Sequence, residues 1–156
     1  GKITNEQYSL YLKQQYECYN ALENRFKSLN GSITPIPENL KRASCIKEDL
    51  EELSIKSKDL PIFKSTQAYI DYISNECSQE LLYAHVYVRY LGDLKGGQMI
   101  AKRIPGEGKF YQFEDPDKSE AFIRSQLRED KSFGEECNKC FDSAIMLFKD
   151  LQTHLS

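Results

Sequence analysis

Long apolar runs are missing from this sequence. A helix that crosses a bilayer needs about 20 consecutive apolar residues, and no stretch of the 156 residues approaches that length. The chain opens on Gly1 rather than methionine, and it lacks the basic and then apolar pattern of a secretory signal peptide. We therefore expect no membrane segment in this chain.

A strong excess of charge of one sign is missing as well. The formal net charge is −3 at pH 7, with 21 Lys and Arg residues against 24 Asp and Glu residues. A nucleic-acid-binding domain normally carries a basic patch and a high pI, so we expect no nucleic-acid partner. Hydrophobic residues make up 40% of the chain, a fraction typical of a folded domain rather than a disordered segment.

Cysteine and histidine are too few and too scattered to form a familiar disulfide or metal framework. The five cysteines are odd in number, which favours a soluble protein of a reducing compartment, such as the cytoplasm or an organelle stroma or matrix. Cys137 and Cys140 form a single CxxC pair, whereas a zinc site would need a second pair or nearby histidines. Structural thiols are the favoured interpretation, with a functional pair as the alternative.

β-Strand patterning is also missing. No segment alternates polar and apolar residues for long enough to build a sheet, whereas apolar residues recur near the helical period of 3.6 along the chain. We expect an all-α fold in a single domain over residues 1–156, without internal repeats. The spacing predicts helices over about 4–26, 38–53, 65–77, 78–104, 115–129 and 133–151.

Capping patterns predict where several of these helices begin. Thr4 opens a capping box, and Asp115 followed by Pro116 is a favoured start of a helix. Ser65 and Ser78 are expected to cap the third and fourth helices.

The fourth predicted helix contains the segment RYLGDLKGGQ (residues 89–98), which carries three glycines. Each glycine in a helix interior costs about 0.8–1.0 kcal/mol relative to alanine. At helical spacing, Arg89, Gly92, Asp93 and Gly96 share one face with His85. A face that packs on the core should be apolar, but this face is polar, charged or without a side chain.

Two interpretations account for this face. Small residues allow two helices to cross closely, and Gly92 and Gly96 taken alone favour that explanation. An aspartate four residues from an arginine fits an apolar crossing poorly. It fits better with a flat ligand that lies against bare backbone, with Asp93 and Arg89 forming a polar network at the ligand's edge. Because glycine-containing segments also kink helices, we expect a kink in this helix.

A family resemblance supports the second interpretation. Residues 84–98, AHVYVRYLGDLKGGQ, closely resemble the distal-helix signature of the heme oxygenases, a histidine and two aromatic positions followed by RYLGDLSGGQ. The similarity covers essentially the whole chain and implies a heme-oxygenase-like multi-helix bundle with a glycine-kinked distal helix. Its other segments are YECYNALENRF (16–26), PENLKRASCIKEDL (37–50), GEGKFYQF (106–113) and CFDSAIMLFKDLQ (140–152).

The resemblance implies an activity and its requirements. Heme oxygenases hold heme between a proximal and a distal helix. They cleave it to biliverdin, carbon monoxide and ferrous iron, using dioxygen and electrons from ferredoxin or an NADPH-dependent reductase. We therefore expect heme b as substrate and cofactor, no other metal, an external electron donor and a monomeric protein.

The resemblance also assigns catalytic roles to individual residues. Gly92 and Gly96 match the distal glycines whose backbone contacts the heme. Asp93 matches the catalytic aspartate that organises proton delivery, and Arg89 and Tyr19 match the residues that hold its network in place.

Five further residues match positions that contact heme in the family. Tyr87 matches a tyrosine near a propionate. Phe141 and Phe148 match aromatic residues that line the pocket, for which core packing is an equally good explanation. Arg124 and Arg128 have the i, i+4 spacing of a basic pair that binds the propionates, although a solvated helix face would explain them too.

The sequence departs from the family most clearly at the proximal ligand. Of its two histidines, His85 matches a distal-helix residue that does not ligate iron, and His154 lies near the C-terminus. We expect His85 to be structural and the proximal helix to be absent from this chain. Smaller departures are Lys95 in place of serine, Ala144 in place of asparagine, and a short segment between Gln98 and Gly106.

Three functions are therefore open at this point. The first is a heme oxygenase, which the retention of Asp93 and both distal glycines favours. The second is a heme-binding or scaffold protein without turnover, which the missing proximal histidine favours. The third is another client of the fold, such as a thiamine-degrading or quinone-synthesis helical bundle, which the match at residues 89–98 disfavours.

Overall fold

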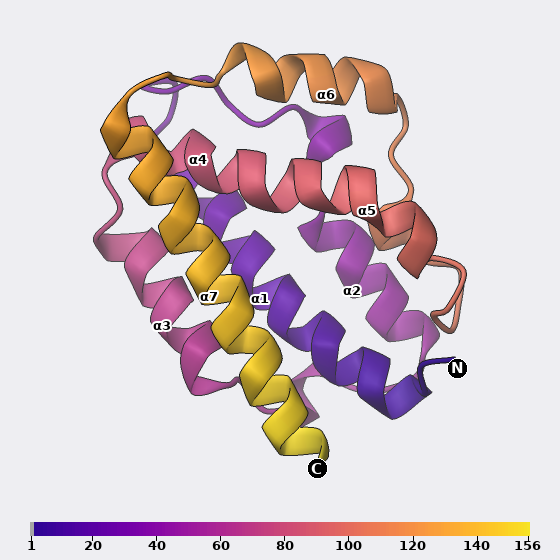
Figure 1. The fold of residues 1–156 in the computed structure, drawn as a ribbon. Helices are drawn as coiled ribbons and strands as arrows, with labels where there is room; N and C mark the ends of the chain where they lie inside the picture. The colour runs from indigo at the N-terminus through magenta and orange to yellow at the C-terminus, as the bar shows by residue number, and fades with distance from the viewer. Residues whose placement is uncertain (1) are drawn as a thin grey trace.

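The computed structural model describes residues 2–156, and every regular element among them is helical (Figure 1). The predicted all-α fold is therefore confirmed. The α-helices are α1 (Asn5–Ser28), α2 (Ala43–Glu52), α3 (Lys64–Asn75), α4 (Leu82–Val86), α5 (Gly92–Ile100), α6 (Pro116–Ser125) and α7 (Lys131–Leu155). Short 3-10 turns cover Glu38–Leu40, Ser57–Asp59, Gln79–Leu81 and Lys109–Tyr111.

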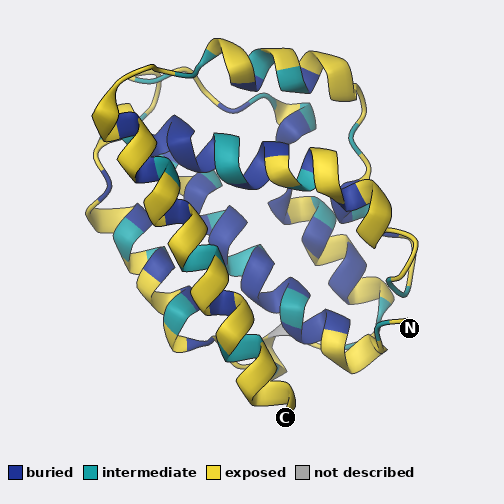
Figure 2. Ribbon diagram, in the orientation of Figure 1, coloured by how far each residue is buried: buried dark blue, intermediate teal, exposed yellow. Residues whose placement is uncertain are grey.

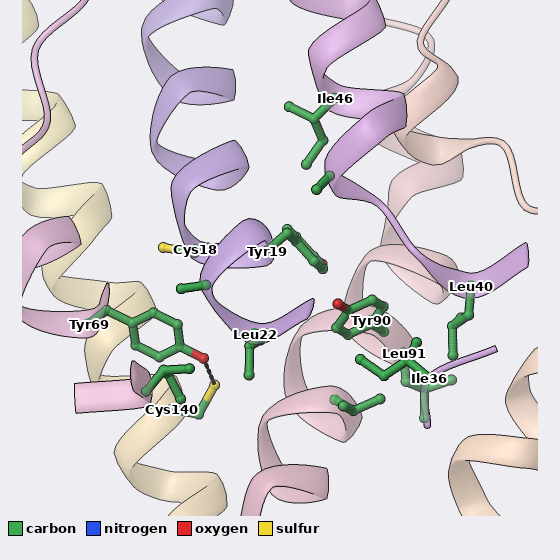
Figure 3. Packing of buried hydrophobic residues seen from close by; sticks show 14 of the residues in the cluster. Cys18, Tyr19, Leu22, Ile36, Leu40, Ile46, Tyr69, Tyr90, Leu91 and Cys140 are labelled. Carbon is green, nitrogen blue, oxygen red and sulfur yellow. Dashed lines mark hydrogen bonds between the residues drawn. The ribbon is translucent and has the colours of Figure 1, made fainter. Parts of the chain in front are cut away.

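Helix α1 runs through the middle of the molecule, with α2 on one side and α3 and α7 on the other (Figure 1). Figure 2 shows that most of α1 is buried or half-buried, whereas α6 is largely exposed. Tyr19 and Leu22 of α1 are completely buried and pack with Tyr90 and Leu40 from distant parts of the chain (Figure 3). The ring of Tyr19 meets that of Tyr90 edge-on at 4.7 Å between centroids. This packing fixes α1 against the segment that carries the glycines.

Helices α4 and α5 are joined by a π-helical turn over Tyr87–Leu91, and together they form one continuous rod (Figure 1). The sequence predicted a glycine kink in this rod, but the distortion begins earlier, in the π-turn that ends directly before Gly92. A single π-turn within an α-helix is rare and is often found at functional sites. The rod ends at Ile100, before Pro105 as expected.

Two of the predicted helix starts are confirmed. The Thr4 hydroxyl accepts a hydrogen bond from the Gln7 backbone N–H at 3.2 Å, and the Gln7 side chain accepts one from Thr4 at 3.0 Å, which completes the capping box. Asp115 accepts a hydrogen bond from the Lys118 backbone N–H at 3.3 Å, with Pro116 in the first turn. Both starts depend on neighbours in sequence, so they could be predicted.

The predicted start of the second helix was wrong. Only a 3-10 turn forms over Glu38–Leu40, and α2 begins at Ala43. The carboxylate of Glu23, on α1, accepts hydrogen bonds from the backbone N–H groups of Arg42 (2.7 Å) and Ala43 (3.3 Å). A side chain 20 residues away therefore satisfies the first donors of α2.

The predicted cap Ser65 was wrong, and Ser78 occupies the N-cap position only of the 3-10 turn that precedes α4. Helix α3 begins at Lys64, and Ser65 instead uses its backbone N–H and hydroxyl to donate to Asp150 of α7 at 3.2 and 2.5 Å. Helix α3 ends at Asn75, so Cys77 lies beyond it. Ser78 precedes a 3-10 turn but makes no side-chain capping bond there.

No helix in the described part of the chain is long and apolar enough to cross a membrane.

Candidate functional site

The glycines of α5 divide between two faces of the helix. A side-chain carbon added to Gly92 or Gly96 would meet no atom within 4 Å, and both residues are exposed. A carbon added to Gly97 would collide with the ring of Tyr111, which is itself buried. Close packing therefore explains Gly97, whereas Gly92 and Gly96 leave an open strip of backbone.

Asp93 lies beside this open strip and contacts Tyr19 of α1. The Tyr19 hydroxyl is hydrogen-bonded to the Asp93 carboxylate and lies 3.0 Å from the backbone carbonyl of Arg89. A hydroxyl has one proton to donate, so with ionised Asp93 it can satisfy only one of these two acceptors at a time. If Asp93 is protonated, its carboxyl can donate to Tyr19 while Tyr19 donates to Arg89. The pair thus has two arrangements that differ by one proton, and both hydrogen bonds form at once only in the protonated one.

Burial raises the pKa of Asp93 from 3.8 to about 6. The hydrogen bond from Tyr19 and the positive charges of Arg89 and Arg42 oppose this effect without cancelling it. Asp93 therefore exchanges its proton close to neutral pH, as a group that donates and accepts protons must.

Arg89 supplies a buried positive charge next to this pair. It is only 7% exposed, and its guanidinium carbon lies 4.2 Å from the centroid of the Tyr69 ring. Its Nη1 donates to the side-chain oxygen of Gln15 at 3.5 Å. Its Nε and Nη2 have no hydrogen-bond acceptor among the described residues. Buried donors without acceptors are costly, so these two are suited to hold a polar ligand or ordered water.

Of the predicted site residues, Tyr19, Arg89 and Asp93 are thus brought together. The structure adds Gln15 and Tyr69, which the sequence did not reveal. Gln15 lies four residues before Tyr19 on α1, so helical spacing was an available signal for it. Tyr69 comes from α3 and has no local relationship to Arg89.

Phe141 and Phe148 do not belong to the core. They are 51% and 48% exposed, so core packing, the alternative explanation, does not account for them. The Phe148 ring stacks on that of Tyr11 at 5.7 Å between centroids. Phe148 and Ile100 also line an apolar hollow of about 280 Å³ among α1, α5 and α7. Helix α7 therefore presents exposed apolar surface at the end of the rod.

Tyr87 lies on the π-turn and is partly buried against the core. The structure shows no contact that tests its predicted position near a propionate, so this role stays a prediction.

The helical pairing of Arg124 with Arg128 was wrong. Helix α6 ends at Ser125, so Arg128 lies beyond it. There it donates to the Glu80 carbonyl at 2.9 Å and pairs with Asp130 at 2.7 Å. Contacts outside the helix hold it, which the spacing alone could not indicate.

Arg124 lies on α6 and is linked to the rod through Glu120. It donates to Glu120 at 2.8 Å, and Glu120 also pairs with Lys95 of α5 at 2.6 Å. Lys95, which replaces the serine of the family pattern, therefore joins α5 to α6 near the open glycines. Propionate binding by Arg124 and Arg128 stays a prediction.

The two histidines lie away from the open strip. His85 is completely buried, with its Nδ1 2.7 Å from the Tyr69 hydroxyl and its Nε2 2.6 Å from Glu136. His85 is therefore a buried histidine with a partner for each ring nitrogen, as expected from the sequence. His154 is exposed near the end of α7, with its ring 5.7 Å from that of Phe63.

Comparisons with known proteins indicate the family to which the chain belongs. The heme oxygenase family model matches residues 1–150. A heme oxygenase from Rhodella violacea is 33% identical over 99% of this chain and 76% of its own length. Heme oxygenase 2 from Oryctolagus cuniculus is 29% identical over 97% of this chain, which spans only 57% of that relative.

Solved structures show the same fold. A heme oxygenase-1 from the cyanobacterium Synechocystis, crystallised with heme, superposes with a TM-score of 0.81 at 24% identity, covering 98% of this chain and 80% of that one. A heme oxygenase from Leptospira interrogans gives a TM-score of 0.77 at 25% identity, covering 91% and 82%. The family match along nearly the whole chain, together with this fold, shows that the protein belongs to the heme oxygenase family.

Proposed function

We propose that the protein is a heme oxygenase that cleaves heme to biliverdin, carbon monoxide and ferrous iron. The observation that carries this proposal is the Tyr19–Asp93 pair beside the open backbone of Gly92 and Gly96. A partly buried carboxylate whose pKa is raised to about 6, beside open backbone, is suited to proton transfer to a bound ligand.

The residues of the open strip fit a heme. Gly92 and Gly96 allow a flat molecule to approach the α5 backbone, because no side chain projects there. Phe141 and Phe148 offer exposed aromatic surface on α7. The unbonded Nε and Nη2 of Arg89 supply donors on the polar side.

Heme, when bound, supplies the redox-active iron and is itself the molecule that is cleaved. The protein positions it and controls the proton supply. Tyr19 holds Asp93 in place, and Asp93 takes up and releases a proton at its carboxylate. Arg89 keeps a positive charge nearby, which limits how far burial raises the pKa of Asp93.

The proposed partner is an external electron donor, either ferredoxin or an NADPH-dependent reductase, and the proposed state is a monomer in a reducing compartment. The described part of the chain shows all five cysteines as free thiols, which suits such a compartment.

The proposal is tested by adding heme to the purified protein with and without imidazole, which can stand in for a histidine ligand to iron. Both ring nitrogens of His85 are already bonded, to Tyr69 and to Glu136, so His85 is poorly placed to bind iron. Added imidazole therefore tests whether heme binding needs a nitrogen ligand from outside the chain. We expect a shifted Soret band and, after a reductase, NADPH and oxygen are supplied, biliverdin. Heme binding without biliverdin would favour the heme-binding scaffold. If no Soret shift appears with imidazole and none appears without it, the proposal is wrong.

A further inference from the structure

The proposed heme chemistry does not use a second polar cluster, which includes His85 of the rod. Cys77 follows α3, His85 lies on α4, and Glu136 lies on α7. All three side chains are buried, and their potential ligand atoms lie within 4.8 Å of one another. The His85 Nε2 is 2.6 Å from the Glu136 carboxylate, and the Cys77 sulfur is 3.6 Å from the same oxygen.

We propose that Cys77, His85 and Glu136 form a binding site for a divalent, thiolate-accepting metal ion, of which zinc is the best fit. Zinc favours sulfur, imidazole nitrogen and carboxylate oxygen, bound at about 2.3, 2.0–2.1 and 2.0–2.2 Å. Tetrahedral ligands at such distances lie about 3.3–3.7 Å from one another. The Cys77–Glu136 distance already has this value. The imidazole and carboxylate need to separate by only about 0.7 Å.

The surroundings of His85 suit a metal ligand. Its other ring nitrogen, Nδ1, is 2.7 Å from the Tyr69 hydroxyl. Metal-bound histidines usually donate from their second nitrogen to such a neighbour, which fixes the ring orientation. The Tyr72 hydroxyl donates to Glu136 at 2.6 Å and so orients the carboxylate in the same way. The site thus already has hydrogen-bonding neighbours that would hold its ligands.

The net charge of the buried cluster does not change when the ion binds. With His85 as an imidazolium paired to the Glu136 carboxylate at 2.6 Å, the cluster is neutral before the ion binds. One divalent ion replaces the proton on His85 Nε2 and the thiol proton of Cys77, and both protons leave to solvent. The net charge of the buried cluster is therefore unchanged. The other groups that face it are Tyr69, Tyr72, Lys139, Cys140 and Arg89.

A route from solvent is present. Tyr72 and Lys139 both contact Glu136, at 2.6 and 3.8 Å. The same two residues line an open groove of about 620 Å³ between α3 and α7. Movement of these two side chains would open a path from the groove to the cluster, and the Tyr72 hydroxyl or a water molecule would complete the coordination.

The site is tested with cobalt(II), which reports on its own ligands by absorption. After removal of bound metal from the full chain, one equivalent of cobalt should produce a thiolate-to-cobalt charge-transfer band, and zinc should abolish that band by displacement. Cys77→Ser should remove the band and weaken zinc binding more than about 100-fold, beyond the roughly 10–100-fold loss expected when only a residue that orients a ligand is changed. Cys45→Ser is the matched control, because Cys45 is a partly exposed thiol on α2.

Folding of each variant is checked by circular dichroism, since a buried substitution can unfold a protein. Zinc should raise the Tm of the wild-type protein and of Cys45→Ser, but not that of folded Cys77→Ser. Absence of a cobalt band in folded wild-type protein would overturn the proposal. An unchanged band in Cys77→Ser would overturn it as well. Neither result bears on heme cleavage, so the two proposals fail independently.

Discussion

The two ends of the α4–α5 rod both carry polar side chains, but the protein treats them in opposite ways. At the α4 end, His85 is completely buried and both ring nitrogens have a partner. Toward the α5 end, Arg89 of the π-turn leaves two nitrogens without an acceptor among the described residues, and Gly92 and Gly96 face open space. A buried polar group that is fully bonded stabilises a fold, whereas one left unbonded is a frequent sign of a binding site.

The largest expected effect concerns the open end. Asp93→Asn keeps an acceptor for the Tyr19 hydroxyl but cannot exchange a proton. We expect biliverdin formation to fall by about 10²–10⁴-fold, the usual contribution of general acid–base catalysis. Heme affinity, measured by Soret titration, should change little. If Asp93→Asn retains full turnover, Asp93 has no role in proton delivery.

The bonded end should respond in stability instead. Glu136→Gln leaves the imidazolium of His85 buried without its counter-charge, which should cost about 3–5 kcal/mol in the free energy of unfolding. Urea denaturation measures this loss. Lys131→Ala is the control, because its pair with Glu135 is exposed and should contribute no more than about 1 kcal/mol. Equal effects of the two substitutions would remove the contrast between buried and exposed pairs.

Asp93 should also make stability depend on pH. Because burial raises its pKa from 3.8 to about 6, the folded state binds this proton more tightly than the unfolded state. The wild-type protein therefore loses stability as the pH rises through that window, by about 1–3 kcal/mol in total. Asp93→Asn lacks this dependence and should be the more stable protein at pH 7. A variant that is less stable at pH 7 would contradict the assignment.

The glycines allow the smallest and most local test. Gly97→Ala should destabilise the fold by about 1–3 kcal/mol, because the new methyl group meets the Tyr111 ring. Gly96→Ala should instead raise stability by up to about 1 kcal/mol, since it meets no atom. The same substitution should weaken heme binding about tenfold, equivalent to 1.4 kcal/mol. Unfolding curves and Soret titrations separate the two roles.

Much of this fold could be predicted because its signals are local. The capping box at Thr4 and the Asp115–Pro116 start both involve residues that are neighbours in sequence. The start of α2 could not be predicted, because its first donors bond to Glu23 on another helix. Arg128 was misplaced for a similar reason, since its partners include a carbonyl of residue 80.

The candidate site was predicted in its residues but not in its geometry. Spacing put Arg89, Gly92 and Asp93 on one face, and the family resemblance supplied Tyr19. Neither indicated that Tyr69 of α3 lies beneath Arg89, or that a π-turn precedes Gly92. The roles of Gly96 and Gly97 are distinguished only by Tyr111, which is remote in sequence.

The open glycines also have a kinetic consequence. Segments with few buried contacts open locally at a lower free energy than the rest of a fold, and glycine gains more backbone freedom on opening than any other residue. In α5, only Leu94 and Gly97 are buried, whereas every residue of α4 is buried. Backbone amides of α5 should therefore exchange with solvent deuterium faster than those of α4. The rate at which α5 opens locally, in addition to the open space beside Gly92 and Gly96, would then set how quickly a ligand enters and leaves.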